Sequence, residues 1–230
     1  MKKIIILFIV IGFVLVGCSQ EQMNEVRGCP DAEISWVDVL MINDIKYEGG
    51  DRSLSEMETL EKGEKIGQVK YKLAGNACFD HKTKNGDAAF LPVGTDIYEL
   101  VGYDSEFRVV ANNKVYQVSE NKKAKSISDL LDIRGKVAKL SLESEYDGSH
   151  ISDFTEQETT KFIEDFLSLD YLGFSKVYKE IDSNQKVFLR IHLKDGSSFR
   201  IVYWLEENAL NVGAFGTEEM KNIVLNKKDN

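Results

Sequence analysis

The chain has 230 residues, of which 43% are hydrophobic, and a formal net charge of −9 at pH 7. This apolar content is enough for one large domain or two small ones and excludes a largely disordered chain. A negatively charged body is repelled by nucleic acid, so we expect no nucleic-acid partner.

The N-terminal segment combines a basic start with a short apolar core. Lys2 and Lys3 precede an uninterrupted apolar and glycine run over residues 4–17. As a helix this run would be about 21 Å long, whereas a hydrocarbon core of about 30 Å needs about 20 residues. The pattern is typical of a signal peptide over residues 1–17, and an uncleaved membrane helix is the alternative.

The end of this segment carries the most specific motif in the chain. Leu15-Val16-Gly17-Cys18 resembles the lipobox of bacterial lipoproteins. In that family the cysteine is acylated, with chains such as palmitate, and becomes the new first residue. The resemblance therefore implies that acylated Cys18 anchors the protein to the lipid bilayer, on the extracytoplasmic face of the cell membrane. Residues 18–32 are polar and aperiodic, and we interpret them as a tether.

Residues 33–120 are expected to form a small β-rich domain. Asn43-Asp44 and Asn112-Asn113 each separate two apolar runs, which predicts hairpin turns. Residues 69–73 alternate apolar side chains with lysines, the period of a half-buried strand. Residues 80–87 are predicted to be a polar loop.

The remainder is predicted to consist of a linker over residues 121–135, with a short helix starting at Ser128-Asp129, and an α+β domain over residues 136–230. Thr155 and Glu158 form a capping box that predicts a helix start. The apolar residues of that helix lie on one stripe, namely Phe162, Ile163, Phe166 and Leu167. Strands are expected at residues 138–142, 176–181, 187–193, 198–205 and 209–214, followed by a helix over residues 217–225. The fold class is therefore α+β: a small β-rich N-terminal domain, then a helix packed on an antiparallel meander.

One strand register follows from the sequence. The apolar sets Val187, Leu189, Ile191, Leu193 and Phe199, Ile201, Tyr203, Leu205 face each other only if the loop between their strands has an odd length. A three-residue loop, Lys194-Asp195-Gly196, satisfies this. We expect the helix to cover this apolar face and to leave the opposite face open.

The opposite face carries a basic cluster, which we call the basic face: Arg190, His192, Lys194 and Arg200. Clustered positive charge on an acidic protein can hold an anionic ligand, such as a wall polymer or an acidic envelope protein. An ordinary solvated sheet face is the alternative.

The three cysteines suggest a disulfide. If Cys18 carries lipid, Cys29 and Cys78 remain, and an oxidising location favours their pairing over two free thiols. Cys78 and His81 also have a spacing that metal sites use, but a complete site lacks an identifiable fourth ligand. Around His150, the acidic residues lack alternating ligand spacing, which favours a hydrated loop over a cation loop. We expect no metal and no cofactor.

The sequence contains no Gly-x-Ser-x-Gly elbow, phosphate-binding glycine loop, His-Glu-x-x-His motif or EF-hand loop. The mature chain resembles the small two-domain lipoproteins of uncharacterised function found in Gram-positive bacteria. We therefore expect a membrane-anchored binding or interaction module at the cell envelope, not an enzyme. The alternatives are an envelope hydrolase with a non-motif active site and a solute-binding lipoprotein.

Overall fold

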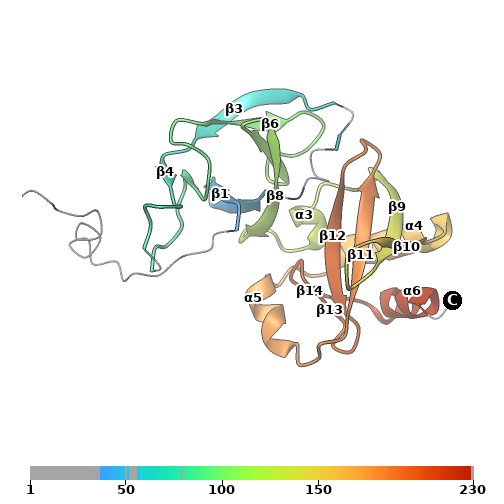
Figure 1. The fold of residues 1–230 in the computed structure, drawn as a ribbon. Helices are drawn as coiled ribbons and strands as arrows, with labels where there is room; N and C mark the ends of the chain where they lie inside the picture. Colours follow the sequence, from blue (N-terminus) through green and yellow to red (C-terminus); the bar gives the residue numbers. More distant parts are fainter. Residues whose placement is uncertain (1–36, 50, 52–55, 58, 79, 229–230) are drawn as a thin grey trace, which may run out of the picture.

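The computed structural model describes residues 37–49, 51, 56–57, 59–78 and 80–228. As predicted, the fold is α+β, with a β-rich first half and a second half in which a helix packs on an antiparallel meander (Figure 1). The first sheet has eight strands in the order β3-β6-β7-β8-β2-β1-β5-β4, and the second has six in the order β10-β9-β11-β12-β13-β14.

The first sheet curls round on itself (Figure 1). Its strands are β1 (Val39–Ile42), β2 (Ile45–Glu48), β3 (Lys62–Gln68), β4 (Tyr71–Lys72), β5 (Asp87–Ala88), β6 (Asp96–Leu100), β7 (Arg108–Ala111) and β8 (Lys114–Asn121). All neighbouring strands are antiparallel except β4 and β5.

Both predicted asparagine turns are confirmed. Asn43 and Asp44 have φ values of 53° and 64°, and Asn112 and Asn113 have values of 50° and 58°. Two consecutive residues with positive φ are what a tight hairpin turn needs, and asparagine and aspartate tolerate this conformation.

The apolar residues at the ends of the alternating segment 69–73 are buried, as predicted, but the strand in this segment is short. Val69 and Leu73 are buried, whereas pairing with β5 is limited to β4, residues Tyr71 and Lys72. The polar loop predicted over residues 80–87 ends earlier than expected, because Asp87 is buried as the first residue of β5.

The second half holds the other strands and the helices. Its strands are β9 (Val137–Glu143), β10 (His150–Asp153), β11 (Lys186–Leu193), β12 (Ser198–Trp204), β13 (Ala209–Leu210) and β14 (Ala214–Phe215). The helices are α3 (Ile127–Leu130), α4 (Glu156–Ser168), α5 (Phe174–Val177), the 3-10 turn η3 (Tyr178–Glu180) and α6 (Glu218–Lys228).

The predicted register of β11 and β12 is confirmed. Leu189 lies opposite Ile201, and the N–H of Leu193 donates to the carbonyl of Ser197 over 2.8 Å. The loop between them therefore has three residues, and Gly196 has a φ of 90°, a conformation that favours glycine.

Helix α4 begins as its capping box predicts. Thr155 accepts from the N–H of Glu158, and the Glu158 carboxylate accepts from the N–H of Thr155. The predicted stripe of α4 is buried in one cluster with the apolar residues of β11, and α4 and α6 lie on the same side of the second sheet (Figure 1). The helix thus covers the apolar face, as expected.

Three assignments in the second half are wrong. Residues 176–181 form α5 and η3 instead of a strand, because Phe174 and Val177 follow a helical spacing after Gly173. Residues 209–214 do not form one strand, since β13 and β14 are joined by a turn in which Gly213 has a φ of 90°. The predicted loop around His150 includes an edge strand, β10.

The start of helix α3 also differs from the prediction. Helix α3 is capped by Ser126 instead of Ser128, with Asp129 as the carboxylate of a capping box. This helix lies between the two sheets in the chain and packs against α4 and β8.

The two sheets share one hydrophobic core. Phe107, next to β7, and Phe199, on β12, lie with ring centroids 6.4 Å apart, edge to face. Arg108 lies beside them, fully buried, and its Nη1 donates to Ser197 Oγ over 2.8 Å. The halves are therefore packed against each other through aromatic rings and a buried guanidinium.

Candidate binding cleft

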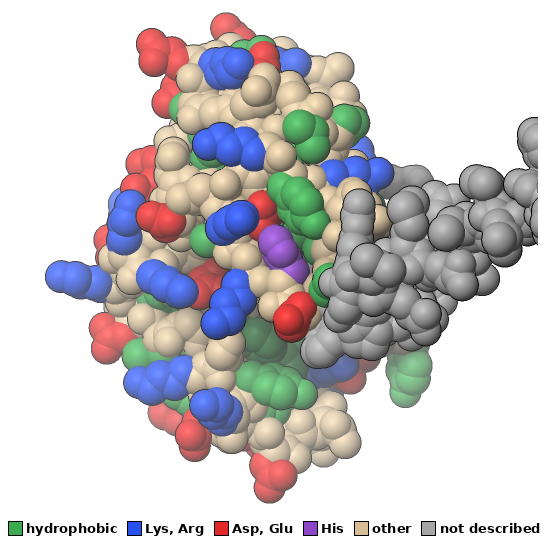
Figure 2. All heavy atoms as spheres, turned by 90° about the vertical axis from the view of Figure 1, so that its left-hand side faces the viewer, with side chains coloured by type: hydrophobic (Ala, Val, Ile, Leu, Met, Phe, Trp, Pro, Cys, Tyr) green, Lys and Arg blue, Asp and Glu red, His purple; other side chains and the backbone are tan. Residues whose placement is uncertain are grey.

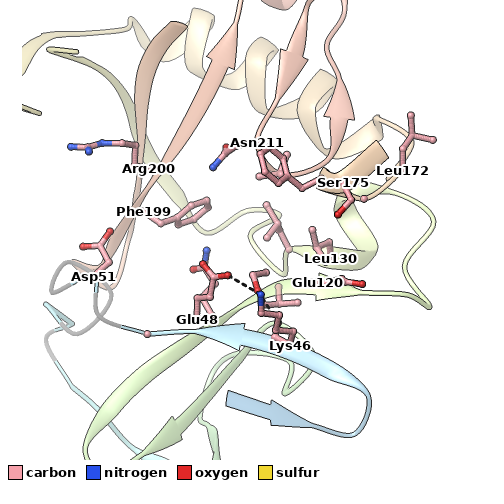
Figure 3. A pocket seen from close by; sticks show the side chains of 18 of the residues that line it. Lys46, Glu48, Asp51, Glu120, Leu130, Leu172, Ser175, Phe199, Arg200 and Asn211 are labelled. Atoms are coloured by element: carbon pink, nitrogen blue, oxygen red, sulfur yellow. Dashed lines mark hydrogen bonds and ion pairs between the residues drawn. The ribbon is translucent and has the colours of Figure 1, made fainter. Parts of the chain in front are cut away.

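A cleft of about 640 Å³ lies between the first sheet and one end of the second sheet (Figure 3). It is lined by β2, β8, the C-terminal end of α3, the start of α5, β12 and the β13–β14 turn. Cavities of roughly 300–1,000 Å³ are the usual size for small ligands. We call this site the inter-sheet cleft.

One wall of the inter-sheet cleft is polar and comes from β2 and β8. Lys46 and Glu48 project from β2 and form an ion pair of 3.6 Å, with about two fifths of each side chain exposed. Lys46 is paired in register with Glu120 of β8, and the Ser119 hydroxyl donates to the Lys46 carbonyl over 3.3 Å. Strand pairing thus fixes the spacing of these charges.

The facing wall carries Phe199 and Asn211 (Figure 3). The Oδ1 atom of Asn211 accepts from the N–H of Val202 over 2.8 Å, and the N–H of Asn211 donates to the Val202 carbonyl over 3.0 Å. Both bonds tie the amide to β12. In Figure 3 the Arg200 guanidinium points away from the cleft, toward the outer face of the second sheet.

An aromatic cluster adjoins the inter-sheet cleft through Phe174, which is part of the cleft lining. The Phe174 ring lies 5.4 Å from Tyr178 and 6.5 Å from Trp204, centroid to centroid. Phe174 is 40% exposed and Tyr178 is 59% exposed. The sequence held a signal for this cluster, since Phe174 and Tyr178 are four residues apart, but the prediction of a strand at residues 176–181 obscured it.

Helix α4 does not cover the basic face, as predicted, but both arginines are ion-paired and the Arg190 side chain is only 16% exposed. Glu143 of β9 is only 6% exposed and lies between them. Arg190 donates from Nε to Glu143, and Arg200 Nε donates to Glu143 Oε2 over 2.6 Å. The sequence did not reveal this carboxylate, because its position depends on the pairing of β9 with β11.

The other two members of the basic face also have partners. His192 Nε2 lies 2.8 Å from Ser141 Oγ, and Lys194 Nζ donates to the Gly135 carbonyl over 2.8 Å. Burial lowers the pKa of His192, and the neighbouring charges of Lys139 and Arg190 lower it further. The histidine therefore adds little positive charge at neutral pH, and anion binding by this face stays a prediction.

Ser141, His192 and Asp153 do not have the geometry of a hydrolase triad. Ser141 Oγ is 2.8 Å from both His192 Nε2 and Asp153 Oδ1, so the serine lies between the acid and the imidazole. In a triad the carboxylate orients the histidine, and the serine is accessible to substrate. Ser141 is only 1% exposed, and a hydrogen bond from Lys139 holds the pKa of Asp153 well below its usual range.

Cys78 is part of a disulfide. Cys18 and Cys29 lie outside the described residues, so the pairing of Cys29 with Cys78 stays a prediction. His81, the other member of the proposed metal pair, has its Nε2 atom 2.7 Å from Asp87 Oδ2 and stacks on Tyr71. Both groups thus have structural roles in the loop before β5.

Within the described ranges, no group of three or more histidine, cysteine, aspartate or glutamate residues is placed to hold a metal ion. Lys and Arg side chains on the face that carries the first sheet are interspersed with Asp and Glu (Figure 2). The inter-sheet cleft is therefore the feature of the described chain that best fits a binding role.

None of the helices in the described part of the chain is long and apolar enough to cross a membrane.

Comparison of the chain with protein-family models, with curated proteins and with solved structures found no match.

Proposed function

We propose that the protein is a lipid-anchored binding module on the extracytoplasmic face of the cell membrane, and that it holds its ligand in the inter-sheet cleft. The observation that carries the binding role is the cleft itself. Its volume of about 640 Å³ suits a ligand, and polar groups from both sheets converge on it around an apolar surface. The anchor rests on the lipobox resemblance of Leu15-Val16-Gly17-Cys18.

The structure of the cleft walls supports binding over incidental space. One wall belongs to the paired strands β2 and β8, the facing wall is held by β12 through its pairing with β11, and the walls meet over one continuous core. A site built on such rigid elements keeps its shape when empty, which reduces the ordering entropy lost on binding.

The anchor is tested by the mature N-terminus. Mass spectrometry of protein from bacterial membranes should find acylated Cys18 as the first residue, and Cys18→Ala should release or mislocalise the chain. A mature chain that begins elsewhere, or that lacks acyl mass, contradicts the anchor without affecting the cleft.

The binding site is tested by photo-crosslinking in intact cells. A photo-reactive amino acid at Ser175, in the lining of the cleft, should form adducts with the bound ligand. The matched control is Ser168, which is also an exposed helical serine but lies at the end of α4, outside the cleft lining. Equal labelling from both positions would show that the cleft is not the binding site.

A solute-binding lipoprotein is the second candidate, because the cleft volume also suits a small solute. Native mass spectrometry of the purified protein distinguishes the two. A small molecule that co-purifies in a one-to-one ratio, and that is lost when Asn211→Trp narrows the cleft, favours solute capture.

A further inference from the structure

The aromatic cluster that adjoins the inter-sheet cleft through Phe174 is partly exposed to solvent. Tyr178 and Phe174 present large ring surfaces, and Trp204 lies beside Phe174. Aromatic rings dominate the energetics of binding surfaces because they bury a large area and lose little side-chain entropy. The cluster adjoins a cleft with polar walls, so the site offers an apolar aromatic surface next to hydrogen-bonding groups.

The charges of the cleft lining nearly cancel. The described lining contains three cations, Lys46, Lys176 and Arg200, and three carboxylates, Glu48, Asp51 and Glu120. The guanidinium of Arg200 points away from the cleft, which leaves one carboxylate in excess, and the whole chain has a formal charge of −9. The field around the protein thus gives no attraction to an anion, which argues against an anionic ligand.

The strands that line the cleft are paired unequally. β2 is paired with both β8 and β1, whereas β12 pairs with β13 only through Tyr203 and Trp204, beyond the part of the strand that lines the cleft. An extended peptide commonly binds by adding a strand to an exposed edge. Peptide binding beside β12 is therefore an outcome that the test must separate from recognition by side chains.

We propose that the inter-sheet cleft binds a neutral glycan. A pyranose ring has an apolar face of C–H groups, which stacks on Phe174 and Tyr178, and an edge of hydroxyl or acetamido groups. Those polar groups take hydrogen bonds from the Ser175 hydroxyl and the Asn211 amide and donate to the carboxylates of Glu48 and Glu120. This inference rests on the proposed function, because it names the ligand class of the same cleft.

The test is isothermal calorimetry on the full lipidated chain in detergent, with two soluble probes. The probes are hexamers of β-1,4-linked N-acetylglucosamine and of α-1,4-linked glucose. We expect at least one hexamer to bind. Because the ligand is uncharged, its affinity should be retained when salt shortens the screening length from about 10 Å to about 3 Å.

Two matched pairs of variants locate the site. Tyr178→Ala removes the more exposed ring of the aromatic cluster and should weaken glycan binding about tenfold or more, as loss of an aromatic anchor does. Tyr146→Ala removes a tyrosine that is 102% exposed on the β9–β10 turn, and it should leave the affinity unchanged. Phe174→Ala is paired in the same way with Phe90→Ala, which is 48% exposed and does not line the cleft. Tyr178→Ala keeps the test valid if Phe174→Ala impairs folding.

The outcomes separate this inference from the proposed function. If neither hexamer binds but the Ser175 crosslink forms, the glycan is wrong and the binding module stands. Tighter binding of a polyglycerol phosphate probe or of a peptide than of either hexamer also overturns the glycan. Equal losses in Tyr178→Ala and Tyr146→Ala would place glycan binding elsewhere and overturn the site. If no probe binds and no crosslink forms at Ser175, the proposed function fails as well.

Discussion

Two buried charges stabilise different parts of the molecule by different means. Arg108 is fully buried between the sheets, where Gln117 Oε1 and Ser197 Oγ accept its hydrogen bonds and the nearest carboxylate oxygen, on Asp195, is 3.9 Å away. Glu143 is 6% exposed within the second sheet and is hydrogen-bonded directly by two guanidinium groups. The cation is thus satisfied largely by neutral oxygens, and the anion by opposite charge.

The rings around Arg108 account for the difference. Its guanidinium carbon lies 4.8 Å from the ring centroids of both Tyr103 and Phe107, and 6.0 Å from that of Phe199. Ring faces attract cations, so a buried arginine needs less direct carboxylate contact when aromatic rings surround it. Burial still lowers the pKa of Arg108, which shows that desolvation opposes its charged form. Because the partners of Arg108 come from both sheets, its environment depends on how the two sheets pack against each other.

Removing the buried cation should have the largest effect. Arg108→Ala leaves a cavity, removes the cation beside Asp195 and takes away the donor that Gln117 Oε1 accepts from. We therefore expect a loss of about 3–5 kcal/mol in the free energy of unfolding. Urea denaturation measures this loss. Arg134→Ala, at an exposed arginine, should change stability by less than about 0.5 kcal/mol. A loss below about 1 kcal/mol for Arg108→Ala would contradict the idea that Arg108 stabilises the packing between the two sheets.

Neutralising the buried anion should have a smaller effect. Glu143→Gln keeps the shape of the side chain but removes the charge that pairs with both Arg190 and Arg200, and it leaves Arg190 with Asp51 at 3.9 Å, so we expect a loss of about 1–3 kcal/mol. Glu145→Gln, two residues further along in an exposed position, is the matched control. Sulfate should then stabilise Glu143→Gln more than the parent, as measured by thermal unfolding. No difference in the sulfate effect would show that the basic face cannot hold an anion even when its own carboxylate is removed.

The link between Tyr103 and Asp195 should contribute less again. The Tyr103 hydroxyl donates to Asp195 Oδ2 over 2.5 Å. Burial acts to raise the pKa of Asp195, but hydrogen bonds from Tyr103 and Ser197 outweigh it and leave the pKa below its ordinary value. Stability from this carboxylate is therefore present above about pH 4 and is lost as the pH falls through the folded-state pKa.

Tyr103→Phe should consequently lower stability by about 1 kcal/mol at neutral pH and shift the acid unfolding limb to higher pH. Tyr98→Phe is the control, because Tyr98 also donates to an aspartate, but over 3.3 Å and to Asp96, whose side chain is 34% exposed against 25% for Asp195. An unchanged acid limb in Tyr103→Phe would show that the tyrosine does not support the charge of Asp195.

The smallest effect concerns His192, which lies on the same face as Glu143. Burial lowers its pKa from the ordinary value of 6.5, and Lys139 and Arg190 act in the same direction, against weaker opposite effects of Asp153 and Glu143. The unfolded chain therefore binds a proton more readily, and stability should fall as the pH decreases through about 6.5 toward the folded-state pKa.

His192→Gln should flatten this slope between about pH 7 and 5, by less than about 1 kcal/mol over the interval. Thermal unfolding at matched ionic strength measures it. If the parent and the variant have the same slope in this range, the pH dependence arises from another group.

Local patterns in the sequence predicted the elements that local physics decides. The turn at Asn112-Asn113, the capping box of Thr155 and Glu158, and the three-residue loop ending at Gly196 each depend on neighbours within a few residues. The same holds for the apolar stripe of α4. Short apolar runs were less informative: Phe174, Val177 and Tyr178 have a helical spacing, but it spans about one turn, which is too short a window for periodicity to distinguish a helix from the strand predicted at residues 176–181.

The candidate site could not be predicted from the sequence for a different reason. The inter-sheet cleft brings Glu48 of β2 opposite Asn211, which follows far along the chain, and no periodicity in the sequence links them. Likewise, Glu143 lies beside Arg190 only because of the register in which β9 pairs with β11, where Glu143 is opposite Phe188. Positions of this kind depend on packing between distant segments and could not be derived from one sequence.

The strand order of the first sheet has a consequence for how fast the chain folds. In the second sheet β11 and β12 pair across a three-residue loop, whereas in the first sheet Ile45 of β2 pairs with Asn121 of β8. Pairing residues so distant in the chain requires closure of a long loop before the contacts can form, and folding rates fall as the mean separation of contacts grows. The second half therefore has the topology of the faster-folding region. Its β11–β12 hairpin can form early and present Ser197 and Phe199 as a surface on which the slower first sheet completes its core.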